Sequence, residues 1–312
     1  MTRKIHQIHD KMMKSILRDK DALQEFFHAF LPDSVKEVID LSQIEHVPGS
    51  FLSPEMKETR TDMIFKCPLI GMKDQEVYLC LIVTEHKSTP DQYVSIQLGG
   101  YIFDSYRKQV NDDEPLKIVL PFLYYHGKEP WTPPALPDLF SDTPKTLHKY
   151  VPEFEIIFEN IQNYSDEQIR LLGSGLFTSA ILAQKYSRDP EAMKERIEQI
   201  FTILESWEDR NLFQSLIVYV LTILQIKLPE LNIIIEKIPK KMKTEIMSLA
   251  DRLREEGKEE GQKEKDTIAA RNMLKRGFSV ADIADILEVS REFVEKIKMT
   301  LDNSTSDKRK SR

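Results

Sequence analysis

The first clear pattern of hydrophobic and polar positions along the chain is a pair of strand-like stretches. Residues 61–67 (TDMIFKC) mix apolar and polar positions, residues 77–84 (VYLCLIVT) form an almost unbroken apolar run, and a turn-rich segment at 71–75 separates them. A short apolar run rich in β-branched and aromatic residues is typical of a strand buried on both faces. The pattern predicts a hairpin whose second strand lies inside a sheet.

The position of the turn predicts which residues of this hairpin face each other. Turn-forming residues are strongest at 73–75, halfway between Asp62 and the pair Glu85 and Lys87. A register centred there brings Asp62 beside that pair. Side chains two positions apart in a strand share a face, so Glu85 and Lys87 point the same way. We therefore expect two carboxylates and one lysine to converge at one strand edge.

Helical periodicity surrounds the hairpin. Residues 9–31 carry apolar side chains at helical spacing and predict one helix or a helix pair, which Pro32 ends. Another helix is expected to begin within 88–91, and residues 116–125 predict a third buried strand that ends at His126. The order strand, strand, helix, strand indicates a mixed central sheet, in which the helix crosses over to a parallel partner.

The second half of the chain is predicted to be helical. Residues 251–265 are almost wholly charged and indicate a solvated helix or a hinge. The segments with apolar residues at helical spacing are 171–185, 190–207, 211–226 and 229–249. We divide the chain into a core at 1–160, an all-helical extension at 161–250, and a charged hinge with a small helical C-terminal module at 251–312.

This last module is expected to contain three short helices. Gly277 is a good stop for the first helix, and Ser279 and Ser290 are suitable N-caps for the next two. Short helices with tight turns resemble a helix-turn-helix, although acidic and basic residues are evenly mixed on the last one. The pattern leaves self-association and DNA binding open as roles. The basic tail at 307–312 is predicted to be disordered.

The composition is that of a globular protein without a membrane-spanning segment. Of the 312 residues 41% are hydrophobic and 30% are charged. A chain of this length is long enough to form more than one compact unit. No apolar run reaches the 18 residues of a membrane-spanning helix. The first residues lack the apolar stretch of a secretory signal, so we expect a cytoplasmic protein with no membrane partner. Cys67 and Cys80 lie in the predicted hairpin without flanking metal ligands and are expected to be buried free thiols.

The residues at the hairpin edge suit the hydrolysis of phosphate esters. Paired carboxylates such as Asp62 and Glu85 hold Mg2+, a hard cation that keeps several waters and binds phosphate oxygens. Lys87 could position a water or neutralise developing negative charge. The alternative is structural: Glu85 and Lys87 form an ion pair on one face, and Asp62 is a surface residue at the start of a strand.

The spacing of these three residues resembles a known signature. Asp62, twenty-two intervening residues and Glu85-x-Lys87 resemble the PD-(D/E)XK nuclease superfamily. The resemblance implies that Asp62 and Glu85 are metal ligands and that Lys87 is the catalytic lysine. It also implies an α/β fold with a restriction-endonuclease-like core. Thr61 stands where the name of the motif has proline, which is a common departure.

Longer strings resemble one family within that superfamily. EHKSTPD at 85–91 and LYYHGK at 123–128, with His9-Asp10 near the start, resemble the recombination-promoting nuclease (YhgA-like transposase) family over roughly residues 5–160. The resemblance implies a Mg2+-dependent DNA endonuclease that promotes recombination, with Mn2+ as a substitute ion. In this fold an acid of the first helix can complete the metal site; Asp10 is either that acid or a helix residue favoured by the helix dipole.

Several further residues are candidates for DNA contact. Gln97 stands where related sequences can carry a basic residue, and Arg60 precedes the hairpin. His126 either supports the site, contacts a phosphate, or is an ordinary strand-end residue. The net charge of −7 is unusual for a DNA-binding protein, so a basic surface must be local. The residues that could form it are Arg60, Lys87, Arg107, Lys108 and Lys128.

Two other functions remain open at this point. The chain could be a non-catalytic DNA-binding or assembly protein that acts through its C-terminal helices, with homo-oligomers formed by the helical regions. The three residues of the motif also do not distinguish DNA from RNA as the substrate. A plasmid-cleavage assay separates the enzyme from the non-catalytic protein.

Overall fold

The computed structural model describes residues 9, 12–47, 62–72, 74–84, 91–173, 175–203, 210–224, 236 and 240–310. The chain divides into two compact units, Met1–Thr244 and Glu245–Arg312. Residue 160, where we expected the core to end, lies inside the first unit. In the described part of the chain, no helix combines the length and the apolar character needed to cross a bilayer.

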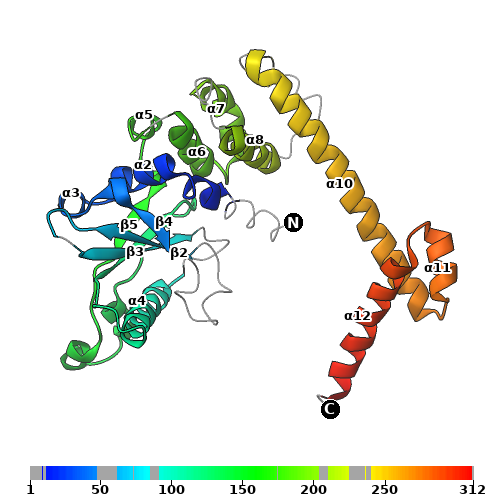
Figure 1. The fold of residues 1–312 in the computed structure, drawn as a ribbon, viewed down its shortest axis with the longest axis horizontal. Coiled ribbons are helices and arrows are strands. Elements are labelled where there is room, and N and C mark those ends of the chain that lie inside the picture. Colours follow the sequence, from blue (N-terminus) through cyan, green and yellow to red (C-terminus); the bar gives the residue numbers. More distant parts are fainter. Residues whose placement is uncertain are drawn as a thin grey trace. The chain divides into compact units, whose positions relative to one another are not determined.

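A five-stranded mixed sheet forms the centre of the first unit (Figure 1). In spatial order its strands are β1 (Glu45–Val47), β2 (Asp62–Pro68), β3 (Glu76–Thr84), β4 (Val119–Tyr125) and β5 (Ile157–Asn160). The pairs β1–β2 and β2–β3 are antiparallel, and the pairs β3–β4 and β4–β5 are parallel. This confirms the predicted mixed sheet and the parallel partner of the second hairpin strand. The four residues of β5 are too few to show an alternating pattern.

Helices precede, connect and follow these strands. In the first unit they are α2 (Lys20–Phe30), α3 (Asp33–Lys36), α4 (Val94–Asn111), α5 (Asp166–Arg170), α6 (Gly175–Lys185), α7 (Pro190–Thr202) and α8 (Arg210–Leu224). The short 3-10 segments are η1 (Leu41–Gln43), η3 (Leu136–Phe140), η4 (Lys145–Tyr150) and η5 (Ile161–Asn163). α10 (Lys240–Lys275) runs into the second unit, which also contains α11 (Val280–Leu287) and α12 (Arg291–Lys310).

The sheet is covered on both faces, as the apolar run of the second hairpin strand predicted. Figure 1 shows α4 on one side and α2 with α6 on the other. Tyr78, Cys80 and Ile82 of β3 pack with Leu98 and Tyr101 of α4. The opposite face is aromatic: Phe26 of α2 contacts Phe122 and Tyr124 of β4 and Phe177 of α6. Burial of large apolar side chains on both faces stabilises this three-layer arrangement.

The helix pair predicted at residues 9–31 is confirmed for its described part. Residues 12–16 are helical, and Asp19 then caps α2 by accepting a hydrogen bond from the backbone nitrogen of Ala22 at 2.8 Å. α2 ends at Phe30, and its C-cap Leu31 has an extended backbone and precedes Pro32. Both predicted cysteines are free and buried, and burial raises the pKa of the Cys67 thiol to about 12.

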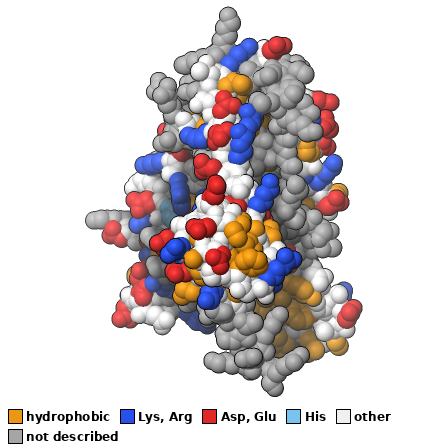
Figure 2. All heavy atoms as spheres, turned by 90° about the vertical axis from the view of Figure 1, so that its right-hand side faces the viewer, with side chains coloured by type: hydrophobic (Ala, Val, Ile, Leu, Met, Phe, Trp, Pro, Cys, Tyr) orange, Lys and Arg blue, Asp and Glu red, His pale blue; other side chains and the backbone are white. Residues whose placement is uncertain are grey.

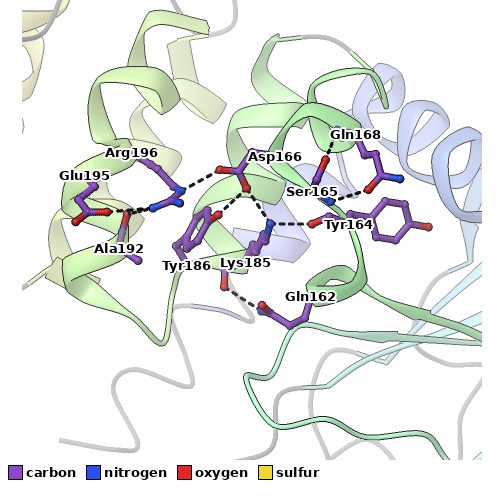
Figure 3. Close-up of polar contacts among 10 residues, drawn as sticks. All are labelled: Gln162, Tyr164, Ser165, Asp166, Gln168, Lys185, Tyr186, Ala192, Glu195 and Arg196. Carbon is purple, nitrogen blue, oxygen red and sulfur yellow. Dashed lines mark hydrogen bonds and ion pairs between the residues drawn. The ribbon is translucent and has the colours of Figure 1, made fainter.

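A polar network joins three helices of the first unit (Figure 3). The carboxylate of Asp166 on α5 accepts hydrogen bonds from Lys185, Tyr186 and Arg196 at 2.8, 2.6 and 2.9 Å. Burial alone would raise the pKa of Asp166, but these three donors lower it to about 2. Ser165 caps the same helix through Gln168. The network fixes α5 against the end of α6 and against α7.

We expect Asp166→Asn to destabilise the protein by about 2 kcal/mol at pH 7, because two cations lose their partner in a largely buried site. The folded pKa of Asp166 lies below its ordinary value of 3.8. Its contribution is therefore complete above about pH 4 and is lost as the pH falls toward 2. Urea unfolding at pH 7 and pH 3 measures this, with exposed Glu191 as the matched control (Glu191→Gln). An equal effect of the two substitutions would contradict the prediction.

The second unit is a small helical module with its own core. Ala270, Ile283, Ala284, Val294 and Ile297 form that core. The predicted stops and caps are confirmed: Gly277 has a φ of +89°, the Ser279 hydroxyl accepts from the Asp282 nitrogen, and the Ser290 hydroxyl accepts from the Phe293 nitrogen. α11 and α12 are separated by residues 288–290 alone, as in a helix-turn-helix.

For this part of the chain one expectation is wrong, and the structure decides between two alternatives that the sequence left open. α12 continues to Lys310, so most of the basic tail predicted to be disordered is helical. Residues 251–265 belong to α10, which also takes in the end of the segment predicted at 229–249. Lys258 and Arg254 form ion pairs with Glu255 and Asp251 one turn away, and such pairs support a solvated helix that lacks an apolar stripe.

We expect Gly257→Ala and Gly261→Ala each to stabilise α10 by about 0.5–1 kcal/mol. Both glycines lie inside the helix, and apart from the adjacent residues and the helix's own backbone nothing lies within 4 Å of where a Cβ would be added. Glycine in an exposed helix costs about 1 kcal/mol relative to alanine. Thermal unfolding of the full chain, followed by circular dichroism at the helical band, measures the gain. A loss of stability would show instead that the glycines make room for another chain segment.

Candidate active site

The strands of the sheet bring several candidate residues to one end of it. β2 begins at Asp62, while β3 and β4 end at Thr84 and Tyr125. Thr84 and Tyr125 are register partners in the parallel pair. The start of one strand and the ends of two others therefore lie at a common end of the sheet, and Glu85 and His126 are the next residues after the register pair.

The hairpin register differs from the predicted one. Asp62 pairs with Ile82, so the hairpin is centred on Met72 rather than on residues 73–75. The turn is centred earlier than expected: the Leu69 nitrogen donates to the Gln75 carbonyl across it, and positive φ angles occur at Gly71 and Asp74. The expectation that Asp62 directly faces Glu85 is wrong. Glu85 comes three residues after the partner of Asp62, which is about 10 Å along an extended chain.

Several predicted site residues lie outside the described part of the structure. For Glu85, Lys87, Arg60 and Asp10 neither backbone nor side chain is described, and for Asp62 the backbone alone is described. Their roles stay predictions. Among the described residues, no group of three or more His, Cys, Asp or Glu side chains could hold a metal ion. A site with three such ligands would therefore include at least one residue outside the described part of the chain.

His126 is buried behind this end of the sheet. Its side chain is 1% exposed, and its ring stacks on Tyr124 with 6.3 Å between ring centres. Burial, with Coulombic repulsion from Arg188, lowers the pKa of His126 to about 3, so the ring is neutral at pH 7. A ring without exposed surface cannot touch a phosphate. The expectation that His126 contacts DNA therefore does not fit the structure, whereas a supporting position does.

Sequence reasoning missed the residues that surround His126. The ring of His9 lies 5.3 Å from that of His126, and His9 Nδ1 is 2.7 Å from the Tyr219 hydroxyl oxygen. Tyr124 donates a hydrogen bond of 3.0 Å to Gln184 Oε1 in the same region. His9 and Tyr219 are 210 positions apart in the chain. No periodicity or spacing in the sequence pairs residues at such a separation. The string His9-Asp10, part of the family resemblance, was the sequence signal that included His9.

α4 carries the remaining predicted contact residue. The helix begins at Val94, after Tyr93, and Gln97 Nε2 donates a hydrogen bond of 3.0 Å to the hydroxyl oxygen of Tyr101. Tyr101 is 1% exposed and belongs to the core, whereas Gln97 is half-buried. The shared face of Gln97 and Tyr101 therefore packs toward the sheet. A phosphate contact by Gln97 stays a prediction.

Three of the basic residues proposed to contact DNA have acidic partners. Arg107 pairs with Asp104, Lys108 with Asp112 at 2.6 Å, and Lys128 with Asp189 at 3.4 Å. These three pairs are explained by the fold without nucleic acid. Figure 2 shows basic and acidic side chains interspersed on the face that it draws, rather than gathered into one basic area.

Comparison with known proteins relates the chain to one group of relatives. It is 27% identical to recombination-promoting nuclease RpnA of Escherichia coli K12 over 292 residues, which cover 91% of this chain and 94% of RpnA. Over 146 residues, 45% of this chain and 54% of the relative, it is 27% identical to recombination-promoting nuclease RpnD of Escherichia coli O157:H7.

A third relative has a different name. The inactive recombination-promoting nuclease-like protein RpnE of Escherichia coli K12 is 24% identical over 281 residues, 86% of this chain and 90% of RpnE. No solved structure matches the chain. The profile of the family described as "Putative transposase, YhgA-like" matches residues 7–227. That range spans the whole sheet and the helices through α8, and the chain belongs to this family.

Proposed function

We propose that this protein is a Mg2+-dependent DNA endonuclease with a PD-(D/E)XK core, and that its cleavage of DNA promotes recombination. Relatives that align with nearly the whole chain or with half of it are named recombination-promoting nucleases. The observation that carries the proposal is the strand arrangement. β2 begins with Asp62 at the end of the sheet where β3 finishes, one residue before Glu85.

In this proposal Asp62 and Glu85 hold the ion. Two carboxylates fit Mg2+, which binds oxygen ligands and keeps several waters. A bound Mg2+ supplies a water of lowered pKa and neutralises charge on the phosphate. Asp10 is the candidate for a third oxygen ligand. The donor set contains no sulfur and no imidazole, so it does not favour Zn2+; Mn2+ is the expected substitute.

Lys87 has a separate task in this proposal. Its ammonium would donate to the non-bridging oxygen of the scissile phosphate, where negative charge grows in the transition state. Lysine serves such a site as a compact point charge on a flexible stem. Glu85 and Lys87 flank one residue, so in an extended backbone both side chains project from the same face. One short segment after β3 would then supply an ion ligand and a phosphate contact.

Incubation of supercoiled plasmid with the wild-type protein and Mg2+ tests the proposal. We expect nicked and then linear DNA, no cleavage in EDTA, and recovery of cleavage when Mg2+ or Mn2+ is added back. Single-stranded and duplex DNA and RNA of the same sequence, run in parallel, identify the substrate. Cleavage in EDTA at the rate seen with Mg2+ would refute the metal requirement, and cleavage of RNA alone would refute DNA as the substrate.

A non-catalytic DNA-binding or assembly protein is the second candidate. One relative that aligns with 86% of this chain carries the name of an inactive protein, and the second unit has the spacing of a helix-turn-helix. α12 exposes Arg291, Lys296 and Lys298 but also Glu292 and Glu295, which weakens the case for DNA. Failure of the wild type to cut any DNA form with any divalent ion, together with DNA retention or oligomer formation, would favour this candidate.

A further inference from the structure

A buried polar cluster connects three distant parts of the first unit behind the proposed active site. His9 comes from the N-terminal helical segment, His126 follows β4, and Tyr219 belongs to α8. All three side chains are between 1% and 2% exposed. Tyr219 meets His9 edge to face with 5.4 Å between ring centres, in addition to the 2.7 Å contact of its hydroxyl. The cluster is thus a closed contact between the sheet end and two helices.

Burying this polar cluster costs free energy that an apolar cluster of the same size would not cost. The two imidazole rings are buried against each other, with 5.3 Å between ring centres. His126 Nδ1 is buried and has no hydrogen-bond partner in the structure as described. A buried polar atom without a partner costs free energy that leucine or phenylalanine at the same place would not. Such a group calls for an explanation beyond stability.

The position of the cluster supplies that explanation. His126 follows Tyr125, the register partner of Thr84, so its place after β4 matches that of Glu85 after β3. His9 directly precedes Asp10 in the chain. The helical segment is docked firmly, because Met13 and Ile16 are fully buried. The contact of His9 with the Tyr219 hydroxyl thus holds the chain beside one predicted ligand, Asp10, and the contact of the His9 and His126 rings joins it to β4, the strand next to β3.

We propose that His9, His126 and Tyr219 are positioning residues that hold the N-terminal helical segment, and with it Asp10, at the sheet end where Asp62 and Glu85 would bind the metal ion. The inference rests on the proposed function and deepens it. None of the three contacts DNA or the ion. They act by fixing where a carboxylate enters the site, as outer-shell partners of metal ligands do.

Removal of one hydroxyl tests this inference. Tyr219→Phe keeps the ring and deletes the group that meets His9 Nδ1. We expect Mn2+ affinity, measured by calorimetry without DNA, to fall about 10-fold, and the Mg2+ concentration for half-maximal cleavage to rise about as much. His9→Ala should do the same. His9→Asn, whose side-chain oxygen can replace Nδ1 as an acceptor, should recover most of the affinity.

The matched control is Tyr164→Phe, which deletes a hydroxyl that donates to Glu159 at 2.7 Å. It should lower thermal stability as much as Tyr219→Phe does and leave the metal requirement unchanged. If Tyr219→Phe and His9→Ala shift only the melting temperature, the cluster is a packing element and the inference is wrong.

The binding measurement also separates this inference from the proposed function. A wild type that binds Mn2+ and loses affinity on Tyr219→Phe, but cuts no nucleic acid, would uphold the positioning role and refute the nuclease. A wild type that binds and cuts, with no change in Tyr219→Phe, would refute the positioning role alone. A wild type that binds no divalent ion would overturn both.

Discussion

Asp62→Asn and Lys87→Ala are each expected to lower the rate of plasmid cleavage by about 10³-fold while the protein stays folded. Asparagine keeps the shape of the Asp62 side chain but removes the charge that holds a divalent ion. Alanine at Lys87 removes a positive charge at the place where negative charge develops, and loss of one such group costs about 10²–10³-fold in rate. Initial rates on supercoiled plasmid, at saturating Mg2+, measure both effects.

The control comes from the same strand as Asp62. Lys66 lies on β2, and its ammonium pairs with Glu45 at 3.0 Å at the edge of the sheet. Lys66→Ala removes a lysine of equal charge and should leave the cleavage rate within about twofold, since a surface ion pair contributes little. Equal rates for Asp62→Asn, Lys87→Ala and Lys66→Ala would remove the proposed site. Circular dichroism and melting temperature establish that each variant is folded.

Phe26→Ala is expected to give the largest loss of stability, about 4 kcal/mol. Phe26 is fully buried and contacts aromatic rings of β4, α2 and α6, so its truncation opens a cavity between the sheet and both helices. Phenylalanine-to-alanine changes in cores cost about 3–5 kcal/mol. Urea unfolding gives the difference in the free energy of unfolding. Cleavage activity should fall only as far as the folded fraction falls.

Two further variants serve as controls for Phe26→Ala. Phe26→Leu keeps most of the volume and should cost about 1–1.5 kcal/mol. Phe103→Ala removes the same ring from a position on α4 that is 52% exposed, and should change stability by less than about 1 kcal/mol. A loss from Phe26→Ala no greater than that from Phe103→Ala would mean that the aromatic layer does not hold the helices on the sheet.

The elements of the fold could be predicted from the sequence where local patterns were strong. The apolar run of residues 77–84 lies within β3, and Ser279 and Ser290 cap helices where expected. These signals are local, since side-chain alternation and capping depend on neighbouring residues. β5 was missed because a strand of four residues shows no period, and the extent of α12 was missed because its end has no apolar stripe.

The geometry of the site could be predicted only in part. The sequence indicated the correct end of the sheet for Asp62 but the wrong register, because the turn, with positive φ at Gly71 and Asp74, is centred on Met72. It could not predict that His9 meets His126 and Tyr219, since such a contact follows from how helices pack on the sheet. Long-range contacts of this kind depend on the tertiary fold rather than on any local preference.

Binding of Mn2+ to the protein without DNA, followed by electron paramagnetic resonance, tests the central claim most directly. The claim is that the acids at the start of β2 and after β3 hold the ion used to cleave DNA. The account predicts that wild-type protein binds Mn2+ and that the double variant Asp62→Asn, Glu85→Gln does not, while the folded fraction is unchanged. Undiminished Mn2+ binding by the double variant would contradict it.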